Sequence, residues 1–510
     1  MIERIDRVDG TPGAPRPLHG AAATRRLEAS AAAALPPFEL MARAGLAVAR
    51  LALALAPHAR SIDVRVGHGN NGGDGLEAAA WLRRWGKDVR VRAVPGFDAR
   101  LPTDAARALA RARDAGVPIV DAADAAGAPA ALVVDALLGI GANRAPDGAL
   151  AGAIEAIGRD GAAGAIVLAV DAPSGLDVTR GHPLGDGAVV AQHTLSLLTL
   201  KPGLFTAAGR DHAGTVWLDT LNCDCGAEPP DALLVGAPAT RRVPRRHAGH
   251  KGSFGDVVVV GGDTSMSGAA LLAARAAQAA GAGRVYLDLL DPGAAEAGHD
   301  PLRPELMWRS RWWHDATPGQ LAAATLVCGC GGGARITETL PRLLEAACRL
   351  VLDADALNAI ASDPALQQAL AARGARGCRT VLTPHPLEAA RLLGRTTAEV
   401  QADRVAAATE LVRRFDCVAL LKGSGSVLAA PGVVPRINAT GNASLASAGT
   451  GDVLAGWIGG WWAQDATAGG EALLEIVATA VATHGAAAGP RAAGAWRAAD
   501  LVDRLALGAR

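Results

Sequence analysis

The chain has 510 residues, half of them apolar, and its 50 basic and 50 acidic residues give a formal net charge of zero. This length predicts two or more domains with separate cores, and the balanced charge argues against nucleic acid or a membrane surface as partner, leaving small metabolites or nucleotides. Seven scattered cysteines are typical of a reducing compartment, and the amino terminus lacks the apolar run of a signal peptide. We therefore expect a cytoplasmic protein without a membrane span.

The first half of the chain alternates short Val/Ile/Leu segments, Gly/Asp/Asn turns and Ala/Leu/Arg helices. This rhythm predicts an α/β fold in which helices cover both faces of a parallel sheet. Strands are expected at 62–67, 88–94, 131–135, 165–171 and 193–198, and the second half resumes the alternation with strands near 325, 350, 380 and 418. Pro, Gly and Arg gather between these halves, which predicts a linker over 226–243 between domains of residues 1–225 and 244–510.

The stretch VGHGNNGGDG (residues 66–75) follows the first of these strands and contains a GxGxxG pattern. A strand, a glycine turn and a helix in this order favour an anionic ligand, because glycines allow close backbone approach and a helix start attracts phosphate. The acidic residue that a nicotinamide dehydrogenase needs after the next strand is missing. Asn70, Asn71 and Asp74 instead offer oxygens for a cation, hydroxyls or a carboxamide. A purely structural polar turn is the alternative interpretation.

Three further turns of similar chemistry follow expected strands in this half. They are DALLGIGANR from Asp135, DAPSGLD from Asp171 with Ser174 inside it, and LTLKPGLF around Lys201. Since the carboxyl ends of adjacent parallel strands line one crevice, Asn71 and the two aspartates are expected to converge there. An isolated aspartate of this kind is better explained as a cap of the following helix, but the repetition at successive strand ends favours a site.

Taken together, GHGNNGGDG, DALLGIG and DAPSGLD resemble the NAD(P)H-hydrate epimerase domain across residues 1–222. The resemblance implies a Rossmann-like three-layer α/β/α domain that binds the hydrated nicotinamide nucleotide. The implied substrate contacts are Asn70, Asn71, Gly72, Gly73, Asp74, Gly139, Ile140, Gly141, Ala142, Asn143, Arg144, Ala145 and Asp171. A potassium ion, K⁺, is implied as well, with Asn71, Asp135 and Ser174 as its ligands. Ile140 and Ala142 depart from the threonine and leucine often found in this family.

An epimerase of this kind must invert one carbon that carries a hydroxyl beside a ring nitrogen. Donation of the nitrogen lone pair opens that centre, so a proton donor and acceptor held near the hydroxyl are sufficient. We expect Asp171 to perform this acid–base work, and Asp135 to be occupied by the cation.

The second half carries GTGD at 449–452 directly before an apolar helix. Glycines at a helix start supply N–H groups for an anion, and an aspartate there accepts a proton from a substrate hydroxyl as charge gathers on phosphate. Lys422, His385 with Glu388, and Asp353 follow other expected strands. Each has an ordinary structural explanation, but their joint occurrence indicates a kinase-like site.

With HKGSFG at 250–255 and GGDTSMSG from residue 261, this order resembles the ADP-dependent NAD(P)H-hydrate dehydratase domain of the ribokinase-like superfamily, across residues 244–510. The resemblance implies a ribokinase-like α/β/α fold in which a nucleotide, ADP with Mg²⁺, phosphorylates the added hydroxyl before phosphate leaves. The implied residues are Asp452 as base, Ala270, Gly331, His385 and Asp452 as substrate contacts, and Lys422, Gly423, Ser424, Gly425, Ser426 and Gly451 around the nucleotide. The sequence departs from the family at Ala443 and Ser444, which replace Pro-Gly, and in GCGGG from Gly329.

The two resemblances together imply a repair enzyme for hydrated NADH and NADPH (NADHX and NADPHX). It would interconvert the R and S hydrates and dehydrate the S form with ADP, giving NAD(P)H, AMP and phosphate. A homo-oligomer is expected. Two alternatives stay open: a ribokinase-like small-molecule kinase whose product keeps its phosphate, and a first half that serves as a nucleotide-binding or protein-interaction module.

Overall fold

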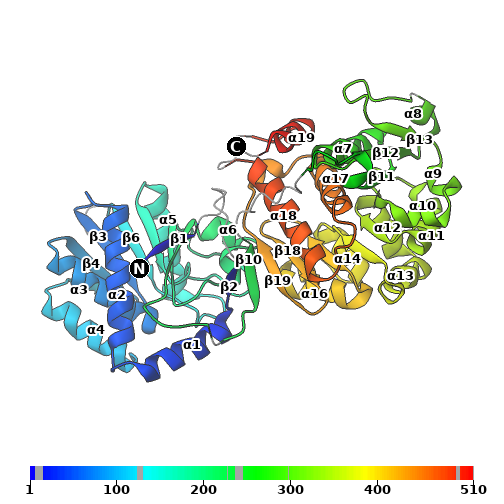
Figure 1. Cartoon of the computed structure of the whole chain (residues 1–510). Helices are drawn as coiled ribbons and strands as arrows, with labels where there is room; N and C mark the ends of the chain where they lie inside the picture. The colour runs from blue at the N-terminus through cyan, green and yellow to red at the C-terminus, as the bar shows by residue number, and fades with distance from the viewer. Residues whose placement is uncertain are drawn as a thin grey trace. The chain divides into compact units, whose positions relative to one another are not determined.

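The structure is a computed structural model that describes residues 1–5, 15–122, 130–226, 228–235, 245–296, 298–489 and 494–508. It divides into two compact units, Met1–Asp6 with Pro17–Ala232 and Arg7–Arg16 with Leu233–Arg510 (Figure 1). Much of the expected linker at 226–243, and the start of the second domain at residue 244, lie outside the described residues. Among the helices described, none combines the length and apolar character needed to cross a membrane.

The first unit is built on a single sheet with the strand order β1-β9-β8-β7-β6-β3-β4-β5. Its elements are β1 (Glu3–Ile5), α1 (Ala21–Ala34), α2 (Glu39–Leu55), β3 (Ser61–Val66), α3 (Asn70–Arg84), β4 (Asp88–Ala93), α4 (Thr103–Asp114), β5 (Ile119–Asp121), β6 (Leu132–Ala136), α5 (Gly148–Ala162), β7 (Ile166–Val170), β8 (His193–Leu197), η1 (Pro202–Leu204), α6 (Gly209–His212) and β9 (Thr215–Asp219), with β2 (Arg16–Leu18) at the division between the units. The strands from β5 to β9 along this order pair in parallel, and β1 pairs antiparallel with β9. All five strands expected in this half are present, whereas the three-residue strands β1 and β5 and the strand β9 were not predicted.

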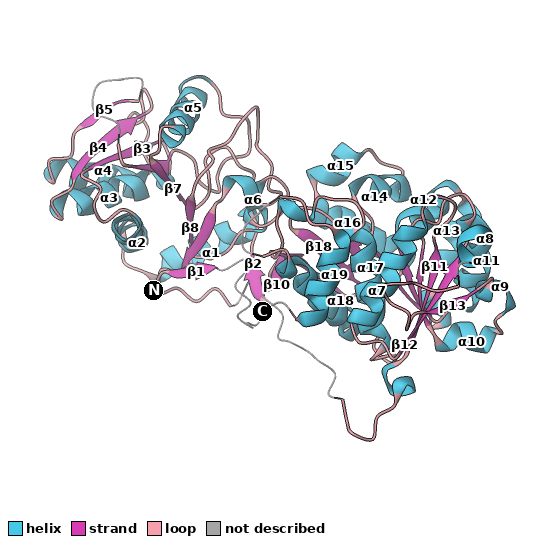
Figure 2. Cartoon of the chain, turned by 90° about the horizontal axis from the view of Figure 1, so that it is seen from above, coloured by secondary structure: helices cyan, strands magenta, loops and turns pink. Residues whose placement is uncertain are grey.

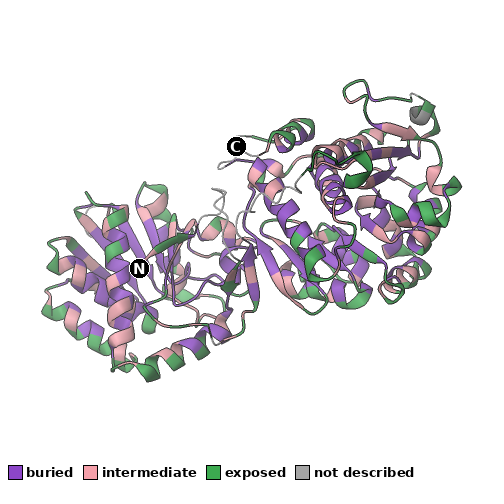
Figure 3. Cartoon of the chain, in the orientation of Figure 1, coloured by how far each residue is buried: buried purple, intermediate pink, exposed green. Residues whose placement is uncertain are grey.

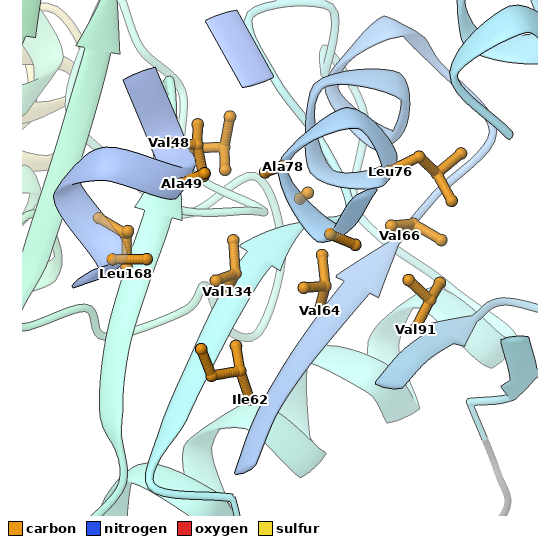
Figure 4. Close-up of a cluster of buried hydrophobic side chains, with 14 of the residues drawn as sticks. Val48, Ala49, Ile62, Val64, Val66, Leu76, Ala78, Val91, Val134 and Leu168 are labelled. Carbon is orange, nitrogen blue, oxygen red and sulfur yellow. The ribbon is translucent and has the colours of Figure 1, made fainter. Parts of the chain in front are cut away.

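Helices cover both faces of this sheet, as the alternation predicts (Figure 2). Crossovers in parallel sheets are right-handed, so α3, which leads from β3 to β4, and α5, which leads from β6 to β7 in the opposite direction, lie on opposite faces. The core packs the small and branched side chains of α2 and α3 on the middle strands, with Val48, Ala78, Val64 and Val134 at its centre (Figure 4). The strand order reverses between β3 and β6, which is where ligands bind in folds of this type.

The glycine-rich stretch is helical, which corrects the expected turn. Helix α3 begins at Asn70 instead of after Gly75, because its glycines allow the first turns to lie directly against the rest of the unit. An ideal Cβ on Gly73 would lie 2.5 Å from the Met41 methyl carbon, and one on Gly75 would lie 2.6 Å from the Ala136 Cβ. These glycines therefore serve protein packing as much as approach to a ligand.

A methyl group at Gly72 is expected to destabilise the first unit by about 1–3 kcal/mol. Its ideal Cβ would lie 2.2 Å from the Gly67 carbonyl oxygen, a backbone atom that moves only with the end of β3. Gly69→Ala is the matched control, since nothing lies within 4 Å of its Cβ position. Urea unfolding followed by circular dichroism compares the two variants, and equal midpoints would contradict this explanation.

The second unit also has one sheet, whose order runs β13-β12-β11-β14-β15-β16-β17-β18-β19-β10. Its elements are β10 (Ala232–Val235), η2 (Lys251–Phe254), β11 (Asp256–Gly261), α7 (Ser267–Ala279), β12 (Arg284–Leu289), α8 (Pro292–Glu296), β13 (Met307–Arg309), α9 (Trp312–Asp315), α10 (Pro318–Ala323), β14 (Thr325–Cys328), α11 (Ile336–Ala346), β15 (Arg349–Leu352), α12 (Ala354–Ser362), α13 (Pro364–Ala371), η3 (Gly374–Arg376), β16 (Arg379–Leu382), α14 (Pro386–Leu393), α15 (Thr397–Ala402), α16 (Arg404–Phe415), β17 (Val418–Leu421), β18 (Ser426–Ala430), β19 (Val433–Asn438), η4 (Ala443–Leu445), α17 (Thr450–Ala463), α18 (Glu471–Ala487) and α19 (Ala498–Leu507). The four strands expected near 325, 350, 380 and 418 are β14 to β17, and they pair in parallel in this order.

The core of this unit lies between the sheet and the helices α7, α17 and α18, and much of α17 and α18 is buried (Figure 3). The strand order reverses between β11 and β14. The loops after β14, β15, β16 and β17 therefore meet at one edge of the sheet, and the predicted catalytic residues lie on them or beside them.

Candidate active sites

A cavity of about 590 Å³ opens in the first unit beyond the ends of β3 and β6, where the strand order reverses. All the expected substrate residues line it except Gly72 and Gly73, which lie behind its wall. The lining includes Asn70, Asn71, Asp74, Gly139, Ile140, Gly141, Ala142, Asn143, Arg144, Ala145 and Asp171, and adds Arg25, Glu28 and Asp104 among others. Segments far apart in the sequence thus converge as predicted.

Asp171 forms a buried ion pair with Lys201 at this cavity. The Lys201 ammonium, which is completely buried, donates to Asp171 Oδ1, to Ser196 Oγ (3.2 Å) and to the Leu197 carbonyl oxygen (2.8 Å). The Leu197 N–H also donates to Asp171 Oδ1, at 3.1 Å. Asp171 has a left-handed backbone, with φ 66°, so it leaves β7 in a sharp turn that aims it at the cavity. The sequence placed the Lys201 turn beside this site but assigned that lysine no role.

Two other carboxyl groups in the cavity hold their protons more tightly than usual. Burial raises the pKa of Asp74 well above its ordinary value, and the charges of Asp171 and Glu28 add to this effect. Burial and the nearby Asp171 likewise raise the pKa of Glu28. Glu28 was not predicted, because it lies on α1, an alanine-rich helix with no motif. The cavity thus combines the ion-paired Asp171 with two carboxyl groups whose pKa values are raised, and such a difference between neighbouring groups is what acid–base catalysis requires.

Of the three expected potassium ligands, Asp135 and Ser174 are hydrogen-bonded to each other, and Asn71 lines the cavity beside Gly139. Asp135 Oδ1 accepts from Ser174 Oγ at 2.6 Å and Oδ2 accepts from the Ser174 N–H at 2.8 Å, while burial raises the pKa of Asp135 to about 6. The Leu138 N–H donates to Ser174 Oγ, and the adjoining Gly139 packs on the Asn71 side chain. The buried Asn71 Nδ2 has no hydrogen-bond partner. A buried carboxylate with hydroxyl and amide oxygens nearby is a donor set that fits a hard cation.

In the second unit, the predicted catalytic residues follow neighbouring strands. Cys330 and Gly331 lie after β14, Asp353 after β15, His385 after β16 and Lys422 after β17. The backbone N–H of Lys422 donates to the Pro384 carbonyl oxygen, and this hydrogen bond connects the loop after β17 to the loop after β16.

Asp452 is the third residue of α17 and belongs to a compact cluster of charged groups. Its carboxylate, the Asp353 carboxylate and the Cys330 thiol have oxygen and sulfur atoms within 4.8 Å of one another. Lys422 Nζ donates to Asp353 Oδ1 at 2.6 Å, and Thr383 Oγ1 donates to the same oxygen at 2.8 Å. This trio has the spacing of metal ligands, but Lys422 already neutralises Asp353. The arrangement suits Asp452 as a base, with the Lys422 ammonium nearby as a positive charge that could bind phosphate.

The protonation of Asp452 is expected to control dehydration, with kcat/KM falling about tenfold per pH unit below about pH 6 and level above it. Burial and the Asp353 charge raise the pKa of Asp452 to about 6. A base must lose its proton to act, so activity disappears as pH falls through this value. Rates between pH 5 and 8, corrected for reaction without enzyme, would measure the inflection.

Cys330→Ala supplies the companion test. A hydrogen bond from the Cys330 thiol lowers the pKa of Asp452, so its removal should move the inflection to higher pH. An inflection that moves to lower pH, or is absent in both proteins, would show that Asp452 is not the titrating group.

The predicted nucleotide loop runs from Lys422 to Ser426 and exposes Gly423 and Ser424. Arg404, almost completely buried beneath it, donates to the carbonyl oxygens of Leu421 (3.2 Å) and Lys422 (3.1 Å). Burial lowers the pKa of Arg404 to about 10, which leaves it charged. Because an ideal Cβ on Gly423 would lie 3.0 Å from this guanidinium, and Gly423 has φ 137°, only glycine suits this position. Arg404 was not predicted, since it reads as an ordinary charge at a helix start.

The other predicted site residues of the second unit differ in their exposure to solvent. His385 is exposed and caps α14 by accepting from the N–H groups of Leu387 (3.1 Å) and Glu388 (3.3 Å). Gly451 lies beside Lys422 Nζ, 3.4 Å from an ideal Cβ. Ala270 is completely buried in the apolar core on α7, so its contact with substrate stays a prediction.

The family departures near α17 are accommodated locally. Ala443 and Ser444 lie in the short helix η4, where Asn442 Oδ1 accepts from the Ser444 N–H at 3.0 Å. The Ser444 carbonyl oxygen accepts from the Trp496 N–H at 2.8 Å. This segment is therefore held in place without Pro-Gly.

Comparison with known proteins finds a family match in each unit. Residues 37–203 match the family model described as YjeF-related protein N-terminus, and residues 257–506 match the NAD(P)H-hydrate dehydratase model. A solved structure of ADP/ATP-dependent NAD(P)H-hydrate dehydratase from Bacillus subtilis, co-crystallised with ATP and Mg²⁺, is 29% identical with a TM-score of 0.42, covering 51% of this chain and 91% of that one.

Curated relatives cover both units at once. A bifunctional NAD(P)H-hydrate repair enzyme of Escherichia coli is 36% identical over 90% of this chain and 86% of its own length. One of Coxiella burnetii with the same description is 35% identical over 84% of this chain and 86% of its own. With such identity across most of both chains, this protein belongs to the bifunctional NAD(P)H-hydrate repair enzyme family.

Proposed function

We propose that the chain repairs hydrated NADH and NADPH in two steps, with an epimerase over residues 1–225 and a dehydratase over residues 244–510. The observation that carries this proposal is the cluster around Asp452, a carboxylate of raised pKa at the start of a glycine-lined helix and next to the Lys422–Asp353 pair. The epimerase supplies the S hydrate that the dehydratase consumes.

In the epimerase cavity, Asp74 or Glu28, whose pKa values are raised, is proposed to donate a proton to the hydrate's hydroxyl, which leaves as water as the ring-nitrogen lone pair forms a double bond to the carbon. Water then adds to either face of that carbon, and Asp171 is proposed to accept the proton that this water loses. Lys201 holds the Asp171 carboxylate in one position. Arg25 and Arg144 add positive charge to the lining, which suits the phosphates of a dinucleotide.

Asn71, Asp135 and Ser174 are proposed to hold K⁺ behind this cavity. A bound cation would neutralise the buried Asp135 carboxylate. It would also hold the predicted substrate segment that begins at Gly139 in place. Replacement of potassium by tetramethylammonium salts is expected to slow epimerisation, and Ser174→Ala should raise the K⁺ concentration needed for half-maximal rate. Unchanged rates in a potassium-free buffer would contradict this assignment.

In the dehydratase site, Asp452 is proposed to take the proton of the S hydrate's hydroxyl while that oxygen attacks the terminal phosphate of the nucleotide. The loop from Lys422 to Ser426, with Gly451, would hold the nucleotide and its Mg²⁺. Phosphate then departs from the carbon with the bonding electron pair, which is easier than for hydroxide because phosphate is a far better leaving group. Loss of a proton from the neighbouring ring carbon to solvent then restores the dihydronicotinamide. Ala270, Gly331 and His385 are the proposed contacts of the hydrate. ADP is the proposed phosphate donor.

The full-length chain tests this function with hydrated NADH, Mg²⁺ and either ADP or ATP. Return of the near-ultraviolet absorbance of NADH, with one inorganic phosphate released per NADH, is expected. Complete recovery from a mixture of both hydrates requires the epimerase as well. A stable phosphorylated product would favour the small-molecule kinase instead. The homo-oligomeric state and the cytoplasmic location also stay predictions. Light scattering would measure the oligomeric state.

A further inference from the structure

Two cysteines face each other at the amino-terminal ends of neighbouring strands in the second unit. Arg349 of β15 pairs with Arg379 of β16, so Cys348 and Cys378, one residue earlier on each strand, lie side by side. Their sulfur atoms are 3.9 Å apart. Adjacent strands are about 4.8 Å apart, and a disulfide accepts Cα separations of roughly 4.4–6.8 Å, so rotation of the side chains can bring the sulfurs into bonding distance.

A buried arginine holds the backbone around both cysteines. The Arg373 guanidinium donates to the Ala347 carbonyl oxygen at 2.7 Å, directly before Cys348, and to the Arg379 carbonyl oxygen at 3.3 Å, directly after Cys378. The Arg379 N–H donates to the Cys348 carbonyl oxygen at 2.8 Å. Because these contacts restrict strand separation, the two thiols stay in register.

The two thiols differ in solvent exposure, and this difference indicates which of them is oxidised first. Cys348 is partly exposed, whereas Cys378 is buried, with 8% of its surface exposed. Burial and the neighbouring Cys378 raise the pKa of Cys348, and the charges of Arg349 and Arg373 oppose this effect. Since the thiolate is the reactive form, oxidation should begin at Cys348 and accelerate as pH rises.

We propose that Cys348 and Cys378 are an oxidation site that forms an intramolecular disulfide with low-molecular-weight disulfides such as oxidised glutathione. The Cys348 thiolate attacks one glutathione sulfur and releases the first glutathione thiolate. The Cys378 thiolate then attacks Cys348 Sγ and releases the second. Two protein thiols are oxidised, one glutathione disulfide is reduced, and the two protons pass to the released thiolates.

The bond would close a loop that contains α12 and α13 and begins with the strand leading to Asp353. Closing a loop removes freedom from the unfolded chain, so oxidation should stabilise the unit. Asp353 comes five residues after Cys348 along β15, about 16 Å at the rise of an extended strand, so the bond should leave the site around Asp452 intact. The inference does not depend on the proposed function.

The test uses the whole chain with Cys223 and Cys225 replaced by serine, because those two thiols are also neighbours in the sequence. This background variant keeps five cysteines. Incubation with oxidised glutathione should lower the thiol count of the denatured chain from five to three. A tryptic digest should contain residues 343–349 linked to residues 377–379. The melting temperature should rise by about 5–10 °C and return after reduction.

Cys348→Ser and Cys378→Ser should each abolish the linked peptide and the rise in melting temperature. Cys417→Ser, which removes a buried thiol elsewhere, should oxidise like the background. Glutathione remaining attached to Cys348 alone, a link between two chains, or an unchanged thiol count would overturn the proposal. The mass spectrum of the background protein decides this even if a serine variant fails to fold.

Discussion

Asp452→Asn is expected to lower the kcat of dehydration by about a thousandfold and to leave the rate of epimerisation unchanged. Removal of a positioned general base typically costs 10²–10⁴-fold, and the amide cannot accept the proton of the hydrate's hydroxyl. The substitution keeps the size of the side chain, and the Asp452 site and the epimerase cavity belong to different units. Stopped-time assays of NADH recovery from the S hydrate would measure the first rate, and exchange between the hydrates would measure the second.

Asp500→Asn is the matched control for this experiment. Asp500 is the third residue of α19 as Asp452 is the third of α17, and its carboxylate is half exposed beside Arg497. Its replacement should change neither rate. If Asp452→Asn folds normally and dehydrates at more than about a tenth of the original rate, Asp452 is not the base.

Lys201→Met is expected to destabilise the first unit by about 3–5 kcal/mol and to slow epimerisation by roughly a hundredfold. The completely buried Lys201 is the ion-pair partner of Asp171, so its removal leaves a carboxylate largely buried without neutralisation. That carboxylate would take up a proton or move, and either response removes the base. Chemical denaturation with fluorescence and the hydrate exchange assay would measure both effects.

Two companions separate the ion pair from general damage. Lys87→Met removes an exposed ammonium that donates to the carbonyl oxygens of Pro57 and Ala59, and should cost less than about 1 kcal/mol. Lys201→Met combined with Asp171→Asn should recover part of the lost stability without recovering activity, because no buried charge is left unpaired. Full epimerase activity in Lys201→Met would show that the pair serves structure alone.

Local patterns predicted the strand ends well, because each buried Val/Ile/Leu segment is followed closely by polar residues and glycines. Asp135 and Asp171 end predicted strands, Asp353 and Lys422 follow them, and all four lie at the carboxyl edges of the two sheets. The same logic predicted their convergence, since neighbouring parallel strands end at one edge. The nine strands expected from the sequence are all present, whereas β9 and β12, which lie inside the two sheets, and the antiparallel strands β18 and β19 were not predicted.

Contacts between distant segments could not be predicted from such patterns. Glu28 belongs to an alanine-rich helix, and the sequence around Arg404 is typical of a surface charge. The fold nevertheless places Glu28, half-buried, near Asp74, and it buries Arg404 under the predicted nucleotide loop. The glycines of residues 67–75 were interpreted as a turn for a ligand, while packing against Met41 and Ala136 makes most of that stretch helical.

The sequence by itself determined the α/β class, the two-unit organisation and the chemical types of the proposed catalytic groups, because these depend on periodicity and on motifs within single loops. Only the tertiary structure decided which charged groups are neutralised. Lys201 forms an ion pair with Asp171, and Lys422 forms one with Asp353. Among the contacts of the described residues, no cationic side chain is hydrogen-bonded to Asp452 or Asp135. Protonation depends on burial and on neighbours that are distant in sequence, and both exist only once the chain has folded.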